Sequence, residues 1–241
     1  TADDGHSYSK PMLSTGFTKN KLADELSMAD PGKMAEQLQI DVRTFTTVTR
    51  LAPDEHAVYI GEEQLKYSKL VLAWGADVIR LDIPGSGHDK IFSINDLMDY
   101  RRFRKALEGK KRVLIMGSGL IGCEFANDLL NGGYEVDVVA PNAMAFEPML
   151  PAPAAAAVTR GLEAAGVHFH FGAVAEKIDT QGPGIRAQLS NGTTIDADIV
   201  LSAVGLRPRT QLVKSVGIKV DRGILVNRAL ETSVKDVYAM G

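Results

Sequence analysis

The sequence predicts an α/β protein built from two related three-layer units, and two observations favour this class. A short apolar run at Arg112–Met116 leads directly into a Gly-x-Gly-x-x-Gly pattern, and a helix-like pattern follows. The runs at residues 69–75 and 199–205 resemble each other, because each follows a predicted hairpin and ends in a glycine. Buried strands of parallel sheets have this continuous apolar composition. Two buried strands that look alike by chance are the alternative for the second observation.

Each glycine of the Gly-x-Gly-x-x-Gly pattern has a separate physical task. Gly117 lets the chain turn tightly after the strand, Gly119 lets the backbone approach a ligand, and Gly122 lets the helix pack closely on the strand. The helix start at Leu120 and Ile121 offers free N–H groups and the positive end of the helix dipole to a phosphate. The pattern therefore predicts a dinucleotide site, with a glycine-rich turn without a ligand as the alternative.

Length and composition restrict the possible function classes. The 241 residues allow one large or two ordinary domains, and the net charge of −3 argues against a general binder of nucleic acid or membrane surfaces. No apolar run approaches the roughly 18 residues of a membrane span, and no signal-peptide pattern is visible. The single cysteine, Cys123, excludes an intrachain disulfide and fits a reduced, cytoplasmic setting.

Local patterns predict the order of helices and strands. The first half should contain a helix at residues 33–38, strands at 43–51, 57–60 and 69–73, a loop at 83–87, and a helix at 96–107 capped by Asn95 or Asp96. The second half should contain strands at 112–116, 134–140 and 167–171, helices at 120–130 and 154–165, and short strands from 174 to 204. Asn191-Gly192 predicts a hairpin among these short strands.

Four motifs, in order along the chain, resemble the family of FAD-dependent pyridine nucleotide-disulfide oxidoreductases. They are the aromatic-x-basic-Pro-x-Leu-Ser pattern at residues 8–14, the Ala-x-Gly…Pro-Gly pattern at 73–85, the Gly-x-x-Pro-x-Thr pattern at 205–210, and the Thr-Ser…Tyr-Ala-x-Gly pattern at 232–241. The resemblance covers essentially the whole chain. It implies two Rossmann-like dinucleotide-binding domains, with FAD in the first and NAD(H) in the second.

The same resemblance implies the domain borders. Residues 1–108 and 221–241 would form a discontinuous FAD-binding domain around an NAD-binding domain at residues 109–220. Members of the family begin with a strand, a glycine-rich turn and a helix that hold the FAD pyrophosphate, and this sequence starts after that place. It also stops one residue before the Asp of the last motif. We therefore expect both ends to be cut from a longer protein and the FAD domain to be incomplete.

The resemblance assigns cofactor contacts to residues of both domains. On the FAD side they are Thr1, Ala2, Lys10, Pro11, Val48, Ala73, Trp74 and Gly75. On the NAD(H) side they are Gly117, Gly119, Leu120, Ile121, Gly122, Glu124, Ala140, Val204 and Gly205.

Three of these residues also have ordinary structural explanations. Glu124 would face the junction of nicotinamide and flavin, or simply complement the helix dipole. Lys10 would stabilise negative charge on the reduced flavin ring, or be a solvated loop lysine. Val48 would meet the adenine through its backbone, or be an ordinary strand valine.

The sequence departs from the family in two places. The strand end at residues 138–142 carries no acidic residue for the NAD ribose and no following arginine for a 2′-phosphate, which favours NADH. The cysteine that thiol-using members carry after the Leu-Ser segment is also absent, since Thr15-Gly16-Phe17 stands there. Disulfide and sulfenate chemistry thereby lose their nucleophile.

These features predict a flavoprotein reductase that passes electrons from NADH through FAD to a small iron–sulfur carrier, with rubredoxin as the expected partner. The cofactors carry the chemistry, so no catalytic side chain is expected. The alternatives are an FAD-dependent NADH oxidase, a peroxide or disulfide reductase, and a non-catalytic NAD-binding module.

His168 and His170 share a strand face, but without further ligands nearby we expect no metal site. The basic run at residues 101–105 fits an acidic partner or, more simply, a solvated helix face.

Overall fold

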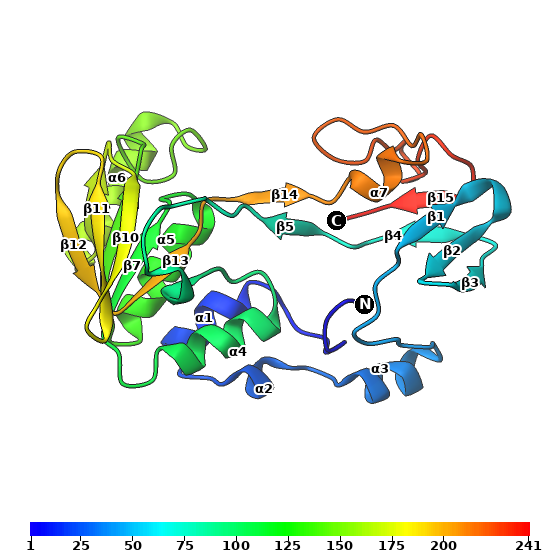
Figure 1. Cartoon of the computed structure of the whole chain (residues 1–241), viewed down its shortest axis with the longest axis horizontal. Coiled ribbons are helices and arrows are strands. Elements are labelled where there is room, and N and C mark those ends of the chain that lie inside the picture. Colours follow the sequence, from blue (N-terminus) through cyan, green and yellow to red (C-terminus); the bar gives the residue numbers. More distant parts are fainter. The chain divides into compact units, whose positions relative to one another are not determined.

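The computed structural model describes all 241 residues, and the chain divides into two compact units (Figure 1). Unit 1 consists of Thr1–His6, Ala29–Asp77 and Leu206–Gly241, and unit 2 consists of Ser7–Met28 and Val78–Gly205. Packing therefore groups part of the first hundred residues with the second unit. The expected domain borders after residues 108 and 220 come from the resemblance and stay a prediction.

Unit 2 is built on a parallel five-stranded sheet in the order β6-β13-β7-β8-β9. Parallel neighbours need crossover connections, and helices supply two of them here, α5 between β7 and β8 and α6 between β8 and β9. The strands are β6 (Ile91–Phe92), β7 (Arg112–Met116), β8 (Glu135–Ala140), β9 (His168–Phe171) and β13 (Ile199–Ser202). The helices of this unit are α1 (Met12–Thr18), α2 (Ala23–Leu26), α4 (Leu97–Ala106), α5 (Leu120–Asn131) and α6 (Ala152–Ala165).

The central strand β7 is buried on both faces, as its apolar composition predicts. Successive side chains of a strand point to opposite faces, so Val113 and Ile115 pack with the helices while Leu114 and Met116 pack with a second sheet. That second sheet is antiparallel and consists of β10 (Ala175–Gln181), β11 (Gly184–Leu189) and β12 (Thr194–Ala197). Unit 2 thus has three layers, with helices on one face of the parallel sheet and the small sheet on the other.

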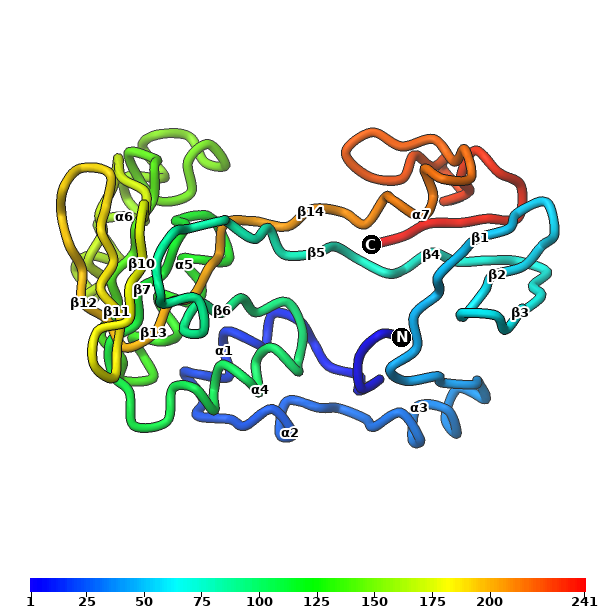
Figure 2. Tube along the Cα trace, viewed as in Figure 1, coloured from blue at the N-terminus to red at the C-terminus, as the bar shows by residue number.

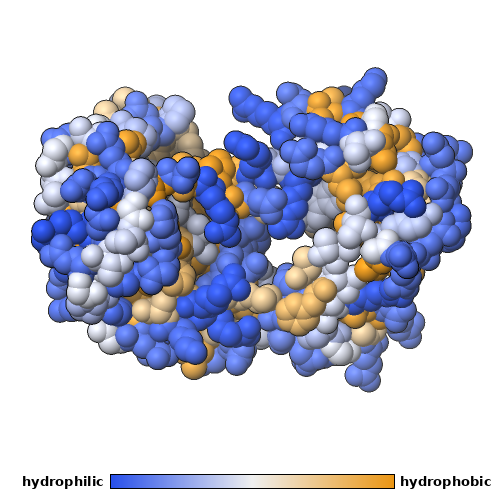
Figure 3. Space-filling model, viewed as in Figure 1, coloured by the Kyte–Doolittle hydropathy of each residue, from blue (hydrophilic) through white to orange (hydrophobic).

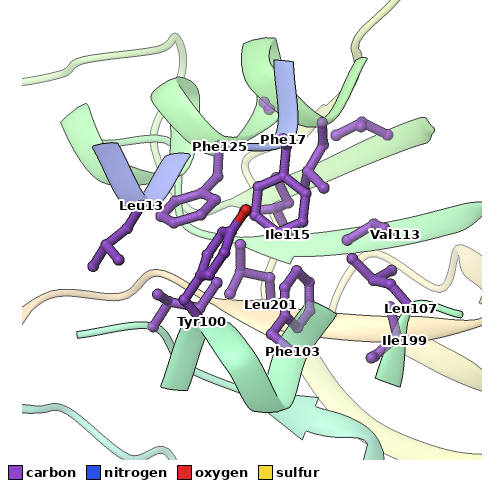
Figure 4. Packing of buried hydrophobic residues seen from close by; sticks show 14 of the residues in the cluster. Leu13, Phe17, Tyr100, Phe103, Leu107, Val113, Ile115, Phe125, Ile199 and Leu201 are labelled. Atoms are coloured by element: carbon purple, nitrogen blue, oxygen red, sulfur yellow. The ribbon is translucent and has the colours of Figure 1, made fainter. Parts of the chain in front are cut away.

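An aromatic cluster joins α1 to α4 and α5 in unit 2 (Figure 4). The ring of Phe17 is 1% exposed and lies 5.1 Å from Tyr100, 5.8 Å from Phe103 and 6.1 Å from Phe125, in edge-to-face arrangements between centroids. The Tyr100 hydroxyl donates to the Lys21 carbonyl oxygen at 2.6 Å, so its burial leaves no unpaired polar group. Burial raises the pKa of Tyr100 to about 12. Figure 2 shows α1 beside α4, although some 85 residues separate them in sequence.

Unit 1 has shorter strands around a smaller core. Strand β4 pairs in parallel with β15, which brings residues near 70 and near 238 together. Val213, Val237 and Leu72 are among the buried residues of this core. The strands are β1 (Arg50–Ala52), β2 (Ala57–Ile60), β3 (Glu63–Lys66), β4 (Leu70–Leu72), β5 (Ala76–Val78), β14 (Leu206–Pro208) and β15 (Val237–Ala239). The helices are α3 (Pro31–Leu38) and α7 (Gln211–Lys214), with a short 3-10 turn at Pro53–Glu55. A second 3-10 turn, at His88–Lys90, belongs to unit 2.

Most predicted elements are confirmed, and one is wrong. The strands at 57–60 and 112–116 are observed with the predicted bounds, and the helix at 96–107 is α4, capped by the Asp96 carboxylate, which accepts the Asp99 N–H at 2.7 Å. The predicted strand at 43–51 is wrong, because only Arg50–Ala52 forms a strand. Phe45 has φ +49°, which interrupts an extended chain, and its N–H donates to Asp3 rather than to a sheet.

The aromatic cluster should dominate the stability of unit 2. Phe17→Ala removes a fully buried ring and should lower the free energy of unfolding by about 3–5 kcal/mol. Phe45→Ala, at a ring that is 67% exposed, should change it by less than about 1 kcal/mol. Urea titration followed by circular dichroism at 222 nm measures both, since the single tryptophan, Trp74, lies in unit 1. Equal losses of unfolding free energy in the two variants would contradict the dominant part of the aromatic cluster in the stability of unit 2.

Candidate dinucleotide-binding site

The turn after β7 is held between the ends of two neighbouring strands. The Gly117 N–H donates to the Val139 carbonyl at the end of β8 at 2.8 Å. The Ala203 N–H, after β13, donates to the Met116 carbonyl at 2.8 Å. Gly117 has φ +106°, and a Cβ there would lie 2.6 Å from the Ala203 carbonyl oxygen. Only glycine fits this position, because a side chain would meet both backbone strain and a fixed carbonyl.

The other two glycines of the pattern have opposite surroundings. A Cβ on Gly122 would overlap the carbonyl oxygen of Gly117, so the close packing predicted for Gly122 is confirmed, with the turn itself as the nearest neighbour. A Cβ on Gly119 would have no atom within 4 Å. Gly119 therefore has no packing role, and its open backbone faces free space where a ligand could approach.

The start of α5 is uncapped by side chains. Gly119 is its N-cap residue, no side chain accepts from the first turn, and that turn contains no acidic residue. The first-turn N–H groups of a helix have no partner within the helix, so this end can bind an anion. Glu124 is exposed and stands in the second turn, four residues after the exposed Leu120, so the two share one face. A helix dipole acts mainly within the first turn, which weakens the purely structural explanation of Glu124.

The sheet order places this turn at a topological switch point. From β7 the chain continues to β8 on one side, while β13 lies on the other side of β7. Open α/β sheets bind ligands at the carboxyl ends of strands where the order reverses in this way. The structure thereby brings nine predicted NAD(H)-side residues to one end of unit 2: Gly117, Gly119, Leu120, Ile121, Gly122, Glu124, Ala140, Val204 and Gly205.

Two residues predicted for the flavin side also lie in unit 2. Pro11 is the N-cap residue of α1, and the neighbouring Lys10 donates from Nζ to Asn95 Oδ1 at 3.0 Å. Helix α1 packs directly against α5. The ammonium group of Lys10 is exposed and held on the segment that precedes α4.

The remaining predicted residues, Thr1, Ala2, Val48, Ala73, Trp74 and Gly75, lie in unit 1. There Trp74 is held by Arg209, a residue that sequence reasoning missed. Trp74 Nε1 donates to the Arg209 carbonyl at 3.0 Å, and Arg209 Nη1 donates back to the Trp74 carbonyl at 2.7 Å. Arg209 Nε also donates to Asp77 at 2.7 Å. Arg209 belongs to the motif at residues 205–210, so two motifs that are far apart in sequence are in contact.

Sequence reasoning also missed the segment between β8 and α6. The Phe146 N–H donates to the Ser118 carbonyl at 2.8 Å, so this segment touches the glycine turn. Its sequence signal is weak, because residues 141–150 are mostly small or apolar and carry a single charge, Glu147.

The two histidines considered as metal ligands contact a carboxylate instead. Asp137 on β8 is 6% exposed and lies 2.9 Å from His170 Nε2 and 3.9 Å from His168 Nδ1, while Arg112 Nη2 lies 3.3 Å away. An arginine beside the carboxylate supplies the compensating charge that a buried acid needs.

No helix of the structure is long and apolar enough to cross a membrane.

Cys123 packs as a small apolar residue on α5, as the sequence predicts. It is 2% exposed, and its Sγ donates to the Ser118 carbonyl oxygen at 3.3 Å. Burial raises the pKa of the thiol to about 12. The thiolate is the reactive form of cysteine, so Cys123 is not a nucleophile near neutral pH.

This thiol should be inert in the folded protein. At pH 8 a group with a pKa of about 12 is only about one part in ten thousand ionised. We expect no reaction with 5,5′-dithiobis(2-nitrobenzoate) within an hour under native conditions. One thiol per chain should react at once in 6 M guanidinium chloride, which is the control for an intact cysteine. Rapid native labelling would show that the helix is open at this point.

Comparison with known proteins agrees with this geometry. The model of the pyridine nucleotide-disulphide oxidoreductase family matches residues 2–241. The chain is 50% identical to a rubredoxin-NAD(+) reductase of Alcanivorax borkumensis and 43% identical to that of Acinetobacter baylyi, in each case over 100% of this chain and 63% of the relative. The crystal structure of the ferredoxin reductase for the CYP199A2 system from Rhodopseudomonas palustris matches with a TM-score of 0.89 and 26% identity, over 99% of this chain and 59% of that chain.

The chain thus spans about 63% of the length of the curated relatives it matches. The family match covers both units, and the relatives align along the whole chain. Together with the glycine turn at the switch point, this means that the chain belongs to the pyridine nucleotide-disulphide oxidoreductase family.

Proposed function

We propose that the full-length protein is an FAD-dependent NADH reductase that delivers electrons to a small iron–sulfur protein, rubredoxin in particular. The single observation that carries this proposal is the strand–glycine turn–helix at the switch point of unit 2, with Gly119 open to a ligand. The family match and the names of the two relatives support it. The segments at residues 8–14, 72–76 and 119–129 resemble rubredoxin reductases in particular.

In this proposal the NAD-binding domain comprises residues 109–220. Gly117, Gly119 and Gly122 shape the turn, and the first-turn N–H groups of α5 bind the pyrophosphate of NADH. Leu120, Ile121, Val204 and Gly205 line the same end of the sheet, and Ala140 ends the strand beside it. Glu124, exposed on the ligand side of the helix, orients the nicotinamide.

The FAD-binding domain comprises residues 1–108 and 221–241 in this proposal. Gly75 fits such a role, because it is exposed, has φ +69° and has no atom within 4 Å of its Cβ position. Thr1, Ala2, Val48, Ala73 and Trp74 would hold FAD with it, and Lys10 and Pro11 would lie beside the flavin. Bound FAD would link the two-electron hydride donor to an acceptor that takes one electron at a time.

The buried, protonated thiol of Cys123 fits an electron transfer that goes directly from the flavin to a protein carrier. The thiol of Cys123 is buried and protonated, so it cannot relay electrons by disulfide exchange. We further propose a cytoplasmic location, because a single cysteine fits a reduced setting. The supply of electrons to alkane hydroxylation is what the resemblance to rubredoxin reductases implies.

The absorption spectrum of the full-length protein tests the proposed function. Flavin bands should be present, and anaerobic NADH should bleach them. The reduced protein should then reoxidise rapidly with rubredoxin and slowly with hydrogen peroxide or a disulfide. Absent flavin would favour a non-catalytic NAD-binding module, and fast turnover of oxygen, peroxide or disulfide would favour the oxidase or reductase alternatives.

A matched pair of glycine variants tests the site itself. Gly119→Ala should raise the KM for NADH at least tenfold, because the added methyl group occupies the space where the pyrophosphate approaches the backbone. Its stability should change by less than about 1 kcal/mol, since Gly119 has φ −76° and no near neighbour. Gly161→Ala, in the interior of α6 with equally open space, is the control and should leave the KM unchanged. Equal KM values in the two variants would place the dinucleotide elsewhere.

A further inference from the structure

The end of β8 lacks the residue that usually identifies the coenzyme. NAD-binding folds place an acidic residue there, about 20 residues after the glycines, to bind the ribose hydroxyls, and NADP-binding folds place a cation there for the 2′-phosphate. In this chain β8 ends at Ala140, and Pro141 and Asn142 follow. The sequence contains no lysine or arginine between Arg112 and Arg160. The end of the strand, residues 138–142, therefore carries neither the usual acid nor a cation.

The loop after β8 returns one carboxylate to this strand end. The Ala143 N–H donates to Glu147 Oε2 at 2.9 Å, and Asn142 Nδ2 donates to the Glu147 carbonyl oxygen at 3.2 Å. Glu147 is therefore seven residues beyond Ala140 in sequence but hydrogen-bonded to the second and third residues after it. The side chain is exposed, and only one of its two carboxylate oxygens accepts a hydrogen bond from the protein.

The same loop is fixed to the glycine turn and to α6. The Phe146 N–H donates to the Ser118 carbonyl at 2.8 Å, within the glycine turn. The buried Ala145 N–H donates to Thr159 Oγ1 on α6 at 3.0 Å. Phe146, the residue before Glu147, is thus hydrogen-bonded to the glycine turn at the carboxyl end of the sheet.

We propose that Glu147 is the specificity-determining residue for the coenzyme: its carboxylate accepts hydrogen bonds from the adenosine ribose of NADH and repels the 2′-phosphate of NADPH. This inference rests on the proposed function of the site. Oε2 is held by the Ala143 N–H, which leaves Oε1 to accept from a ribose hydroxyl. With no lysine or arginine in residues 113–159, no cationic side chain of this segment offsets the repulsion between Glu147 and a 2′-phosphate.

Glu147→Gln in the full-length protein tests the proposal. The amide oxygen of Gln can still accept the Ala143 N–H, so the loop should keep its shape while the charge is lost. Calorimetric titration with NAD⁺ and NADP⁺ gives the two dissociation constants without requiring turnover, and steady-state rates with NADH and NADPH give kcat and KM. We expect the preference for the non-phosphorylated coenzyme to fall at least tenfold, through weaker NAD⁺ binding and stronger NADP⁺ binding, with kcat for NADH unchanged.

Glu163→Gln is the matched control, because Glu163 is an exposed acid in the last turn of α6, at the opposite end of that helix from the loop. It should leave the preference unchanged. A 2′-deoxy analogue of NAD⁺ should bind the wild-type protein more weakly than NAD⁺ does. The Glu147→Gln variant should bind the analogue and NAD⁺ equally well. If Glu147→Gln weakens both coenzymes equally, or leaves both unchanged, the proposal is overturned. Failure of NADH to reduce the wild-type flavin would instead contradict the proposed function, while the two dissociation constants would still test Glu147.

Discussion

The backbone carbonyls of Gly117 and Ala203 leave no room for a side chain at the turn after β7, and the geometry of the candidate site depends on this crowding. Gly117 can turn with φ +106° only because it has no Cβ, and its own carbonyl then occupies the place of a side chain on Gly122. These two contacts set the position of α5 on the sheet. The third glycine, Gly119, has no atom within 4 Å of its Cβ position, so the protein does not crowd the start of α5 there.

The packing of unit 2 explains why this turn is well supported. Strand β7 is covered on one face by helices and on the other by the small antiparallel sheet, so it cannot shift without disturbing both cores. The ring of Phe17 packs α1 against α4 and α5, which are distant from it in sequence.

The visible face in Figure 3 is mainly hydrophilic, with apolar residues in separate patches, as is usual for a folded domain.

Electrostatics at the carboxyl end of the sheet limit which anions can bind there. The uncapped start of α5 can attract an anion, while the segment from residue 113 to 159 offers no cationic side chain. Glu147 adds negative charge where the loop returns to the strand end. The buried acid of the same strand, Asp137, is held by Arg112 and His170. The two carboxylates thus differ in their surroundings, because Asp137 is buried and Glu147 is exposed.

The sequence by itself determined the α/β class, most strands and helices, and the tasks of Gly117 and Gly122, because strand burial, helix ends and the lack of a Cβ are local properties. It could not place the strand predicted at 43–51, since the positive φ of Phe45 follows from bonding to the N-terminal residues. Only the tertiary structure decided that residues 7–28 pack with the second unit, that Arg209 holds Trp74, and that Glu147 returns to the end of β8. Each of these depends on contacts between residues that no local pattern connects.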